Sequence, residues 1–222
     1  MKRLLLRLGP VAVSAVLLVL VLRRVRLDDS LAALARIRPG TLALAIALTF
    51  VAYAGRAQRW AGLLARAGLR VRARACYVLT LLGTGYGLVT PGRVGEFARV
   101  LHLDLPRART LASVVWDRVT DVLLLEALGV PAFLLVPAWR GPLLWLFAAI
   151  VAATAGVVAV LESDALQRLA ARGLPFTAGP IARWQEASRG TLTSSAFVVG
   201  LAGGLFFYVV SSLAAFLLAR EL

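Results

Sequence analysis

The stretch that decides the fold is Gly83-Thr84-Gly85-Tyr86-Gly87-Leu88-Val89-Thr90-Pro91-Gly92-Arg93-Val94-Gly95-Glu96-Phe97-Ala98-Arg99. Its first half is apolar enough to enter a membrane, whereas its second half carries Arg93, Glu96 and Arg99. Pro91 interrupts a continuous helix, and the glycines allow backbone shapes that other residues avoid. Irregular backbone at membrane depth survives only inside protein or beside a water-filled cavity, and interrupted segments mark binding sites in transporters. We therefore treat this stretch as a candidate binding site. The alternative is a helix, a turn and a loop with ordinary surface charges.

The composition is that of a protein with several membrane-spanning helices. Of the 222 residues, 60% are hydrophobic and 16% are charged, whereas a soluble domain is about half apolar and a quarter charged. Several apolar runs approach the roughly 20 residues that span a bilayer. The expected fold is an all-α polytopic integral membrane protein, with about five transmembrane helices and one re-entrant segment broken by glycine and proline.

The distribution of arginine orients these segments. If the segment at residues 75–91 crossed the membrane, the positive-inside rule would fail, whereas a re-entrant segment leaves more than twice as many basic residues inside as outside. The arginine-rich loop 56–74 is then cytoplasmic, with Trp60 at the interface. We expect a single transmembrane domain over residues 1–222, with spans at 5–22, 41–55, 111–136, 141–161 and 191–219, the re-entrant segment at 75–91 and an interfacial segment at 162–190.

The charge and the rare residues limit the partners. The net charge is +14, and all of the 25 basic residues except Lys2 are arginines. No aromatic-interleaved basic motif accompanies them, so we expect anionic lipid headgroups rather than nucleic acid as partners. The single cysteine, Cys76, excludes an intramolecular disulfide and a cysteine metal cluster, and the single histidine, His102, excludes a multi-histidine metal site. We expect no metal and no cofactor, and we expect Cys76 to be a packed apolar residue.

The fourth apolar segment contains charges that need partners. Asp117 and Asp121 share one helix face, and Arg118 lies about 100° around the helix. Each charge at the bilayer centre costs roughly 2.5–3.5 kcal/mol on insertion scales. These side chains must therefore face the interior of the bundle and find opposite charges.

The obvious partners lie in the stretch that opens this section. We expect Arg93 or Arg99 to pair with the aspartates, and Glu96 to pair with Arg118. The alternative is an ion-pair network that only clamps the helix to the loop. Glu126 lies on the opposite face and is expected to have a structural or interfacial role.

The aromatic residues and the last span have structural interpretations. Most tryptophans and tyrosines lie near expected span ends, which is typical of an interfacial belt. Gly200 and Gly204 form a small-xxx-small pair, which predicts close packing between helices.

Enzyme chemistry has little support. Asp117 and Asp121 could act as an acid and a base, so an intramembrane enzyme is one function class to test. However, the sequence has no nucleotide-binding loop, nucleophile elbow or metal motif. We expect no catalytic residue.

Two motifs resemble the flippase-like lysylphosphatidylglycerol synthase transmembrane family. Residues 90–99 read TPGRVGEFAR and residues 113–121 read SVVWDRVTD, similar to that family's P-G-R-x-G-E-x-x-R stretch and its following acid-Arg-x-x-Asp helix. Arg59-Trp60 also fits, and the similarity covers roughly residues 5–222. The resemblance implies a membrane protein that handles lipids. In the best-understood members, this domain moves an aminoacylated phospholipid across the bilayer, and a separate soluble domain performs the aminoacyl transfer. Other relatives are linked to polyprenyl-lipid sugar pathways.

The resemblance also implies a larger unit. Family members usually continue into further spans and a second Pro-Gly-Gly-x-Gly-x-x-Glu motif, so this chain is expected to match only the N-terminal half to two-thirds. A second copy, as a homo-oligomer, or a partner subunit would then supply the rest.

The expected function is recognition and translocation of an anionic phospholipid or polyprenyl-phosphate lipid in a bacterial-type inner membrane. The alternative is a non-transporting subunit or accessory of a lipid-modifying or glycosyl-transfer enzyme. Arg93 and Arg99 are expected to hold the phosphate, the acids to position these arginines or receive a lipid amine, and Arg118 to balance the acids. The candidate substrate-binding residues are Arg93, Glu96, Arg99, Asp117, Arg118 and Asp121, with Pro91, Gly92 and Gly95 shaping the loop.

Overall fold

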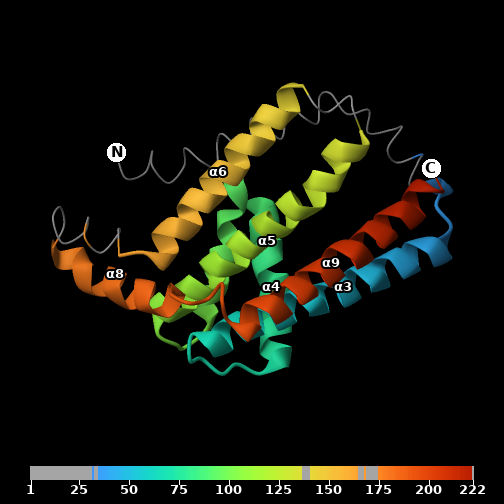
Figure 1. Ribbon diagram of the computed structural model, residues 1–222. Helices are drawn as coiled ribbons and strands as arrows, with labels where there is room; N and C mark the ends of the chain where they lie inside the picture. The colour runs from blue at the N-terminus through green and yellow to red at the C-terminus, as the bar shows by residue number, and fades with distance from the viewer. Residues whose placement is uncertain (1–31, 33–34, 137–140, 165–167, 169–174, 222) are drawn as a thin grey trace, which may run out of the picture.

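All regular secondary structure in the part of the chain that the structure describes is helical. A computed structural model describes residues 32, 35–136, 141–164, 168 and 175–221. The expected span at residues 5–22 lies outside these ranges. The principal elements in chain order are α3 (Pro39–Arg66), α4 (Ala73–Val89), the 3₁₀ helix η1 (Pro91–His102), α5 (Arg107–Leu135), α6 (Pro142–Glu162), α8 (Pro175–Ser188) and α9 (Ser195–Ala219) (Figure 1).

Three of these helices can cross a membrane by length and composition, namely α3, α6 over Leu143–Glu162, and α9. This confirms a helical membrane protein, while the number of five spans stays a prediction. α4 has 17 residues, short of the roughly 20 that a bilayer requires. α5 is long enough but carries the charges of the candidate site.

The helix α3 is longer than the sequence suggested. The expected span ends at residue 55 and a loop follows, but the helix continues to Arg66 and places Arg56, Arg59 and Trp60 inside a regular helix. Arginine, alanine and leucine are good helix formers, so an arginine-rich stretch need not be a loop. The helix ends before Gly68, whose φ of +78° suits a glycine after a helix C-terminus. Trp60 is fully buried inside the protein, so it does not face lipid headgroups as expected of an interfacial amphipathic stretch.

α3 and α9 lie side by side and run in opposite directions (Figure 1). At one end, the Arg66 guanidinium donates to the Arg189 carbonyl over 2.8 Å. At the other end, the Thr41 hydroxyl donates to the Glu221 carboxylate over 3.1 Å. The two helices therefore contact each other along their lengths.

Glycines allow this close approach. A Cβ added at Gly55 would lie 2.7 Å from the Gly203 carbonyl oxygen, and one added at Gly203 would lie 2.7 Å from the Gly55 carbonyl oxygen. Gly200 and Gly204 face Arg59 in the same seam. The predicted close packing of the last span is confirmed, because no side chain fits between the two backbones.

α4 and η1 form a hairpin. Near its tip, a Cβ on Gly95 would lie 2.3 Å from the Tyr86 carbonyl oxygen. Further along, Leu79 of α4 and Val100 of η1 belong to one buried apolar cluster. The chain thus returns toward the end at which α4 begins, and whether this hairpin is re-entrant in a membrane stays a prediction. The side of the membrane to which it returns stays a prediction.

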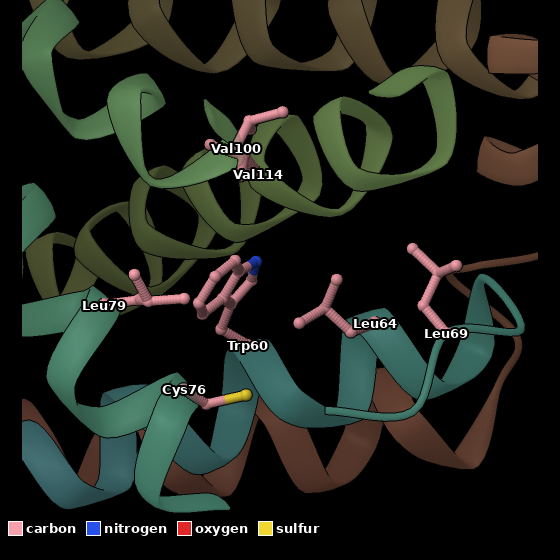
Figure 2. Packing of buried hydrophobic residues seen from close by; sticks show 7 residues of the cluster. All are labelled: Trp60, Leu64, Leu69, Cys76, Leu79, Val100 and Val114. Atoms are coloured by element: carbon pink, nitrogen blue, oxygen red, sulfur yellow. The ribbon is translucent and has the colours of Figure 1, made fainter. Parts of the chain in front are cut away.

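A buried apolar cluster fixes this hairpin to α3 and α5 (Figure 2). At its centre, Trp60 donates its indole N–H to the Ser113 hydroxyl over 3.1 Å. Cys76 is fully buried beside it, as predicted. The members of this cluster are Trp60, Leu64, Leu69, Cys76, Leu79, Val100 and Val114.

The opposite side of α5 packs against other helices. Trp116 and Phe197 contact each other edge to face, with ring centroids 6.2 Å apart. Glu126 accepts a hydrogen bond of 2.7 Å from Thr154 of α6, which confirms its structural role. α5 therefore packs on both sides, with Val114 in the cluster beside the site charges and Trp116 and Glu126 against other helices. α8 lies within the expected interfacial segment, part of which falls outside the described residues.

Candidate functional site

The motif in η1 has the spacing of a 3₁₀ helix. Residues three apart eclipse each other in this helix type, so Arg93, Glu96 and Arg99 follow one line along η1. The side chains of Glu96 and Arg99 are buried, whereas 59% of the Arg93 side chain is exposed. The motif therefore places Glu96 and Arg99 inside the helix bundle and Arg93 at its exposed edge, which we call the rim.

The predicted pairing between η1 and α5 is confirmed. The Arg99 guanidinium donates to Asp117 over 2.5 Å, and neither side chain has more than 1% of its surface exposed. Arg118 donates to Glu96, as expected. These pairs compensate the cost of burying the charges, because an unpaired ion away from water is strongly unfavourable.

Arg93 does not reach either aspartate. Its nearest acidic group is Glu96, with 3.9 Å between Arg93 Nε and Glu96 Oε1. The backbone φ of Arg93 is 58°, an uncommon value for a residue with a Cβ. Thr90 holds this turn, since its hydroxyl accepts from the Gly95 N–H over 2.7 Å and donates to the Tyr86 carbonyl over 2.8 Å.

Two further arginines, which the sequence predicts in a loop, come from α3. Arg59 donates to Asp117 over 2.7 Å and to Asp121 over 2.6 Å. Arg56 donates to Asp121 over 2.8 Å and to Glu96 over 3.3 Å. The signal that could have identified them is their spacing of three at the end of an apolar run, which places both on one helix face.

We call the buried ionic group at the junction of α3, η1 and α5 the charge cluster. Its four arginines face three carboxylates, which leaves one positive charge in excess, and Arg93 at the rim adds a second. No member has a side chain more than 24% exposed. The members are Arg56, Arg59, Glu96, Arg99, Asp117, Arg118 and Asp121.

Aromatic rings and glycines surround the charge cluster. The Arg99 guanidinium lies 4.4 Å from the ring centroid of Trp60, and the Arg56 guanidinium lies 5.4 Å from that of Phe207. Rings at this distance attract a cation through their quadrupole. On the α9 side, a Cβ on Gly204 would lie 2.7 Å from Nη1 of Arg59, so only glycine leaves room for the guanidinium.

The charge cluster lies well inside the length of an apolar helix. Gly200 and Gly204, which contact Arg59, follow the first residue of α9 by five and nine positions. At 1.5 Å per residue this is about 8–14 Å from the start of a helix long enough to span a membrane. An ionisable group within a membrane-spanning segment is by default a candidate functional residue.

Several buried polar atoms of the charge cluster have no hydrogen-bond partner among the described residues. Buried polar groups are normally hydrogen-bonded, so such atoms indicate a place for water or for a ligand. Most of them are arginine donors, and donors bind anions. They are Nε of Arg56, Nη1 of Arg59, Nε of Arg99, Nε of Arg118 and Oε1 of Glu96.

The cluster is unlike a metal site or a catalytic dyad. All three carboxylates are paired with arginine. In the residues that the structure describes, no three histidine, cysteine or acidic side chains are arranged to hold a metal ion.

A separate cavity of about 610 Å³ opens between the start of α5 and α8, and its wall includes the exposed side chains of Arg107 and Arg183.

The comparisons with known proteins agree with the motifs. The model of the family described as the lysylphosphatidylglycerol synthase TM region matches residues 7–222. No curated protein and no solved structure gave a match. The resemblance that the two motifs indicated is therefore confirmed over nearly the whole chain.

Proposed function

Because the chain belongs to the lysylphosphatidylglycerol synthase TM family and is a membrane protein of lipid-related function, we propose that it recognises and translocates an anionic lipid. The lipid is an anionic phospholipid or a polyprenyl phosphate. The membrane is the inner membrane of a bacterial-type cell, which the chain crosses several times.

One observation carries this proposal. The charge cluster has more arginines than carboxylates, and arginine donors within it have no partner among the described side chains. An anion with several acceptor oxygens supplies both the missing charge and the missing hydrogen bonds. The common membrane anion with several acceptor oxygens is the phosphate group of a lipid headgroup.

The geometry suggests a division of roles. Arg99 is fully enclosed between Asp117 and the Trp60 ring, so in this proposal it positions the loop and does not contact the lipid. Arg93 and Arg118 retain exposed surface, 59% and 24% of their side chains, and receive the phosphate. Among the acids, Asp121 has the most accessible carboxylate and is the candidate partner for a lipid amine.

Lipid movement is tested in proteoliposomes that contain a fluorescent anionic lipid in both leaflets. A membrane-impermeant quencher removes only the outer-leaflet signal, so the wild-type protein should make the inner-leaflet lipid accessible as well. Arg93→Lys keeps the charge and loses the planar fork, and Arg93→Gln loses both. We expect activity to fall in the order arginine, lysine, glutamine.

The control variant is Arg183→Gln, an exposed arginine in the wall of the separate cavity. It should behave as wild type, which shows that general attraction of anionic lipid is not being measured. If neither wild type nor any variant moves lipid but the wild-type protein retains it, the chain is a non-transporting lipid-binding subunit. Equal activity of a folded Arg93→Gln protein contradicts the role of Arg93.

A further inference from the structure

We infer that the lipid phosphate binds where the carboxylate of Glu96 lies in this structure, so that Glu96 is an internal anion which the lipid displaces. This inference rests on the proposed function and specifies its phosphate subsite.

Glu96 is held as a bound anion would be. Its Oε2 accepts from Arg118 and, over 3.3 Å, from Arg56, and Arg93 approaches Oε1 to 3.9 Å. Three arginines from three different elements thus converge on one carboxylate. Of the three carboxylates in the charge cluster, Glu96 is the one that lies within 4 Å of Arg93, the most exposed of these arginines. Asp117 and Asp121 instead contact Arg59, whose side chain has no exposed surface.

A carboxylate fills this position incompletely. Glu96 Oε1 has no hydrogen bond from any described group, and Nε of Arg56 and Nε of Arg118 are also unpaired. A phosphate group has more acceptor oxygens, arranged as a tetrahedron, and arginine can bind two of them at once. Replacing the carboxylate by phosphate therefore satisfies donors that Glu96 leaves free.

The position is reached from the rim. Side-chain exposure falls from 59% at Arg93 to 24% at Arg118 and 4% at Glu96. A headgroup that enters along this line meets the two partly exposed arginines before it meets the buried carboxylate.

The position has no spare room while Glu96 is in place. A Cβ added at Gly87 would lie 2.7 Å from Cγ of Glu96, so the glutamate packs directly on the backbone of α4. Phosphate and the Glu96 carboxylate therefore compete for one volume and for the same arginines. Removing the negative charge at position 96 should strengthen phosphate binding.

The experiment measures binding of phosphatidylglycerol to the full chain in detergent, by native mass spectrometry and by the lipid-induced rise in melting temperature. Glu96→Gln keeps the shape and removes the charge. We expect it to bind phosphatidylglycerol more tightly, on the order of tenfold, which is the scale of one hydrogen bond to a charged group. Without lipid, the melting temperature of Glu96→Gln should be lower than that of wild type. Added lipid should raise the melting temperature of the variant by more than it raises that of wild type.

A second variant covers the case in which Glu96→Gln does not fold. Glu96→Asp keeps the charge but withdraws the carboxylate from Arg118 by one methylene, so binding should equal or exceed that of wild type. Glu126→Gln is the matched control, since this glutamate bonds Thr154 on the other face of α5. It should leave lipid binding unchanged.

Two further ligands separate the possible failures. Diacylglycerol has the same acyl chains without phosphate, and inorganic phosphate has no chains. If wild type binds phosphatidylglycerol no better than diacylglycerol, the proposed function fails. If wild type prefers phosphatidylglycerol but folded Glu96→Gln and Glu96→Asp bind it more weakly, only the subsite inference is overturned, and Glu96 is a structural clamp. If inorganic phosphate binds as well as the lipid and Glu96→Gln strengthens it, the subsite stands and the lipid assignment fails.

Discussion

Arg59 and Asp117, which are 58 residues apart in the chain, contact each other over 2.7 Å with no exposed surface on either side chain. This pair joins α3 to α5 at the centre of the charge cluster. Because both groups are away from water, neither tolerates the loss of the other. The fold and the candidate site therefore share the same interactions.

Asp117→Asn should destabilise the protein strongly. The carboxylate accepts from both Arg59 and Arg99, so its loss leaves two buried guanidinium groups with less compensation. Breaking a buried ion pair from one side costs about 3–5 kcal/mol. A melting curve in detergent measures the effect. The control is Asp164→Asn, whose partner Arg189 is on the surface, where a pair contributes about 0–1 kcal/mol. Equal melting temperatures for the two variants would contradict the buried network.

Gly95→Ala should disrupt the hairpin, whereas Gly85→Ala should not. A Cβ at position 95 would lie 2.3 Å from the Tyr86 carbonyl oxygen, and this backbone contact cannot relax by a rotamer change. A Cβ at Gly85 meets nothing within 4 Å. Overpacking typically costs about 1–3 kcal/mol, while glycine to alanine in an open helical position is neutral or stabilising. Thermal stability and lipid retention of the two variants test this difference. A stable, lipid-binding Gly95→Ala protein would show that η1 does not pack on α4 as described.

Arg93→Gly and Arg93→Ala should separate backbone strain from phosphate binding. Both variants lose the guanidinium, so both should lose lipid retention. Because the φ at this position is 58°, alanine keeps the penalty of a Cβ in the left-handed region and glycine removes it. The glycine variant should therefore be more stable than the alanine variant by about 1 kcal/mol. Chemical unfolding in detergent gives the comparison. A less stable glycine variant would mean that the left-handed conformation is absent in solution.

Cysteine labelling should place the end of η1 on the cytoplasmic side. Val94 and His102 are both exposed, and the only natural cysteine, Cys76, is fully buried. Single cysteines at positions 94 and 102 in a Cys76→Ala background are treated with a membrane-impermeant thiol reagent in intact cells. We expect position 102 to react only after the cells are opened. Labelling of position 102 from outside would rule out a re-entrant hairpin and would make α4 a crossing helix.

Much of this arrangement could be predicted from the sequence. Apolar runs and low charge indicate membrane helices, because a bilayer accepts only segments that satisfy their own backbone hydrogen bonds. The positions of Asp117 and Asp121 four residues apart predict a shared helix face. The cost of burying their charges then predicts that Arg93 or Arg99 pairs with one of these aspartates, and the structure shows the pair to be Arg99 with Asp117. The same reasoning predicts the pair between Arg118 and Glu96.

What only the tertiary structure decided is which arginines complete the cluster. Local spacing determines the face of a helix, but the crossing of two helices determines which faces meet. Arg93 stays exposed because it lies near the start of η1, six residues before Arg99, which at about 2 Å per residue is roughly 12 Å along the same line. Arg56 and Arg59 resembled a polar loop because arginine is common both in helices and in cytoplasmic loops. In the fold, the glycines of α9 leave room for Arg59, and Arg56 lies against Phe207 of the same helix. These outcomes depend on contacts between distant elements, which no pattern along one element records.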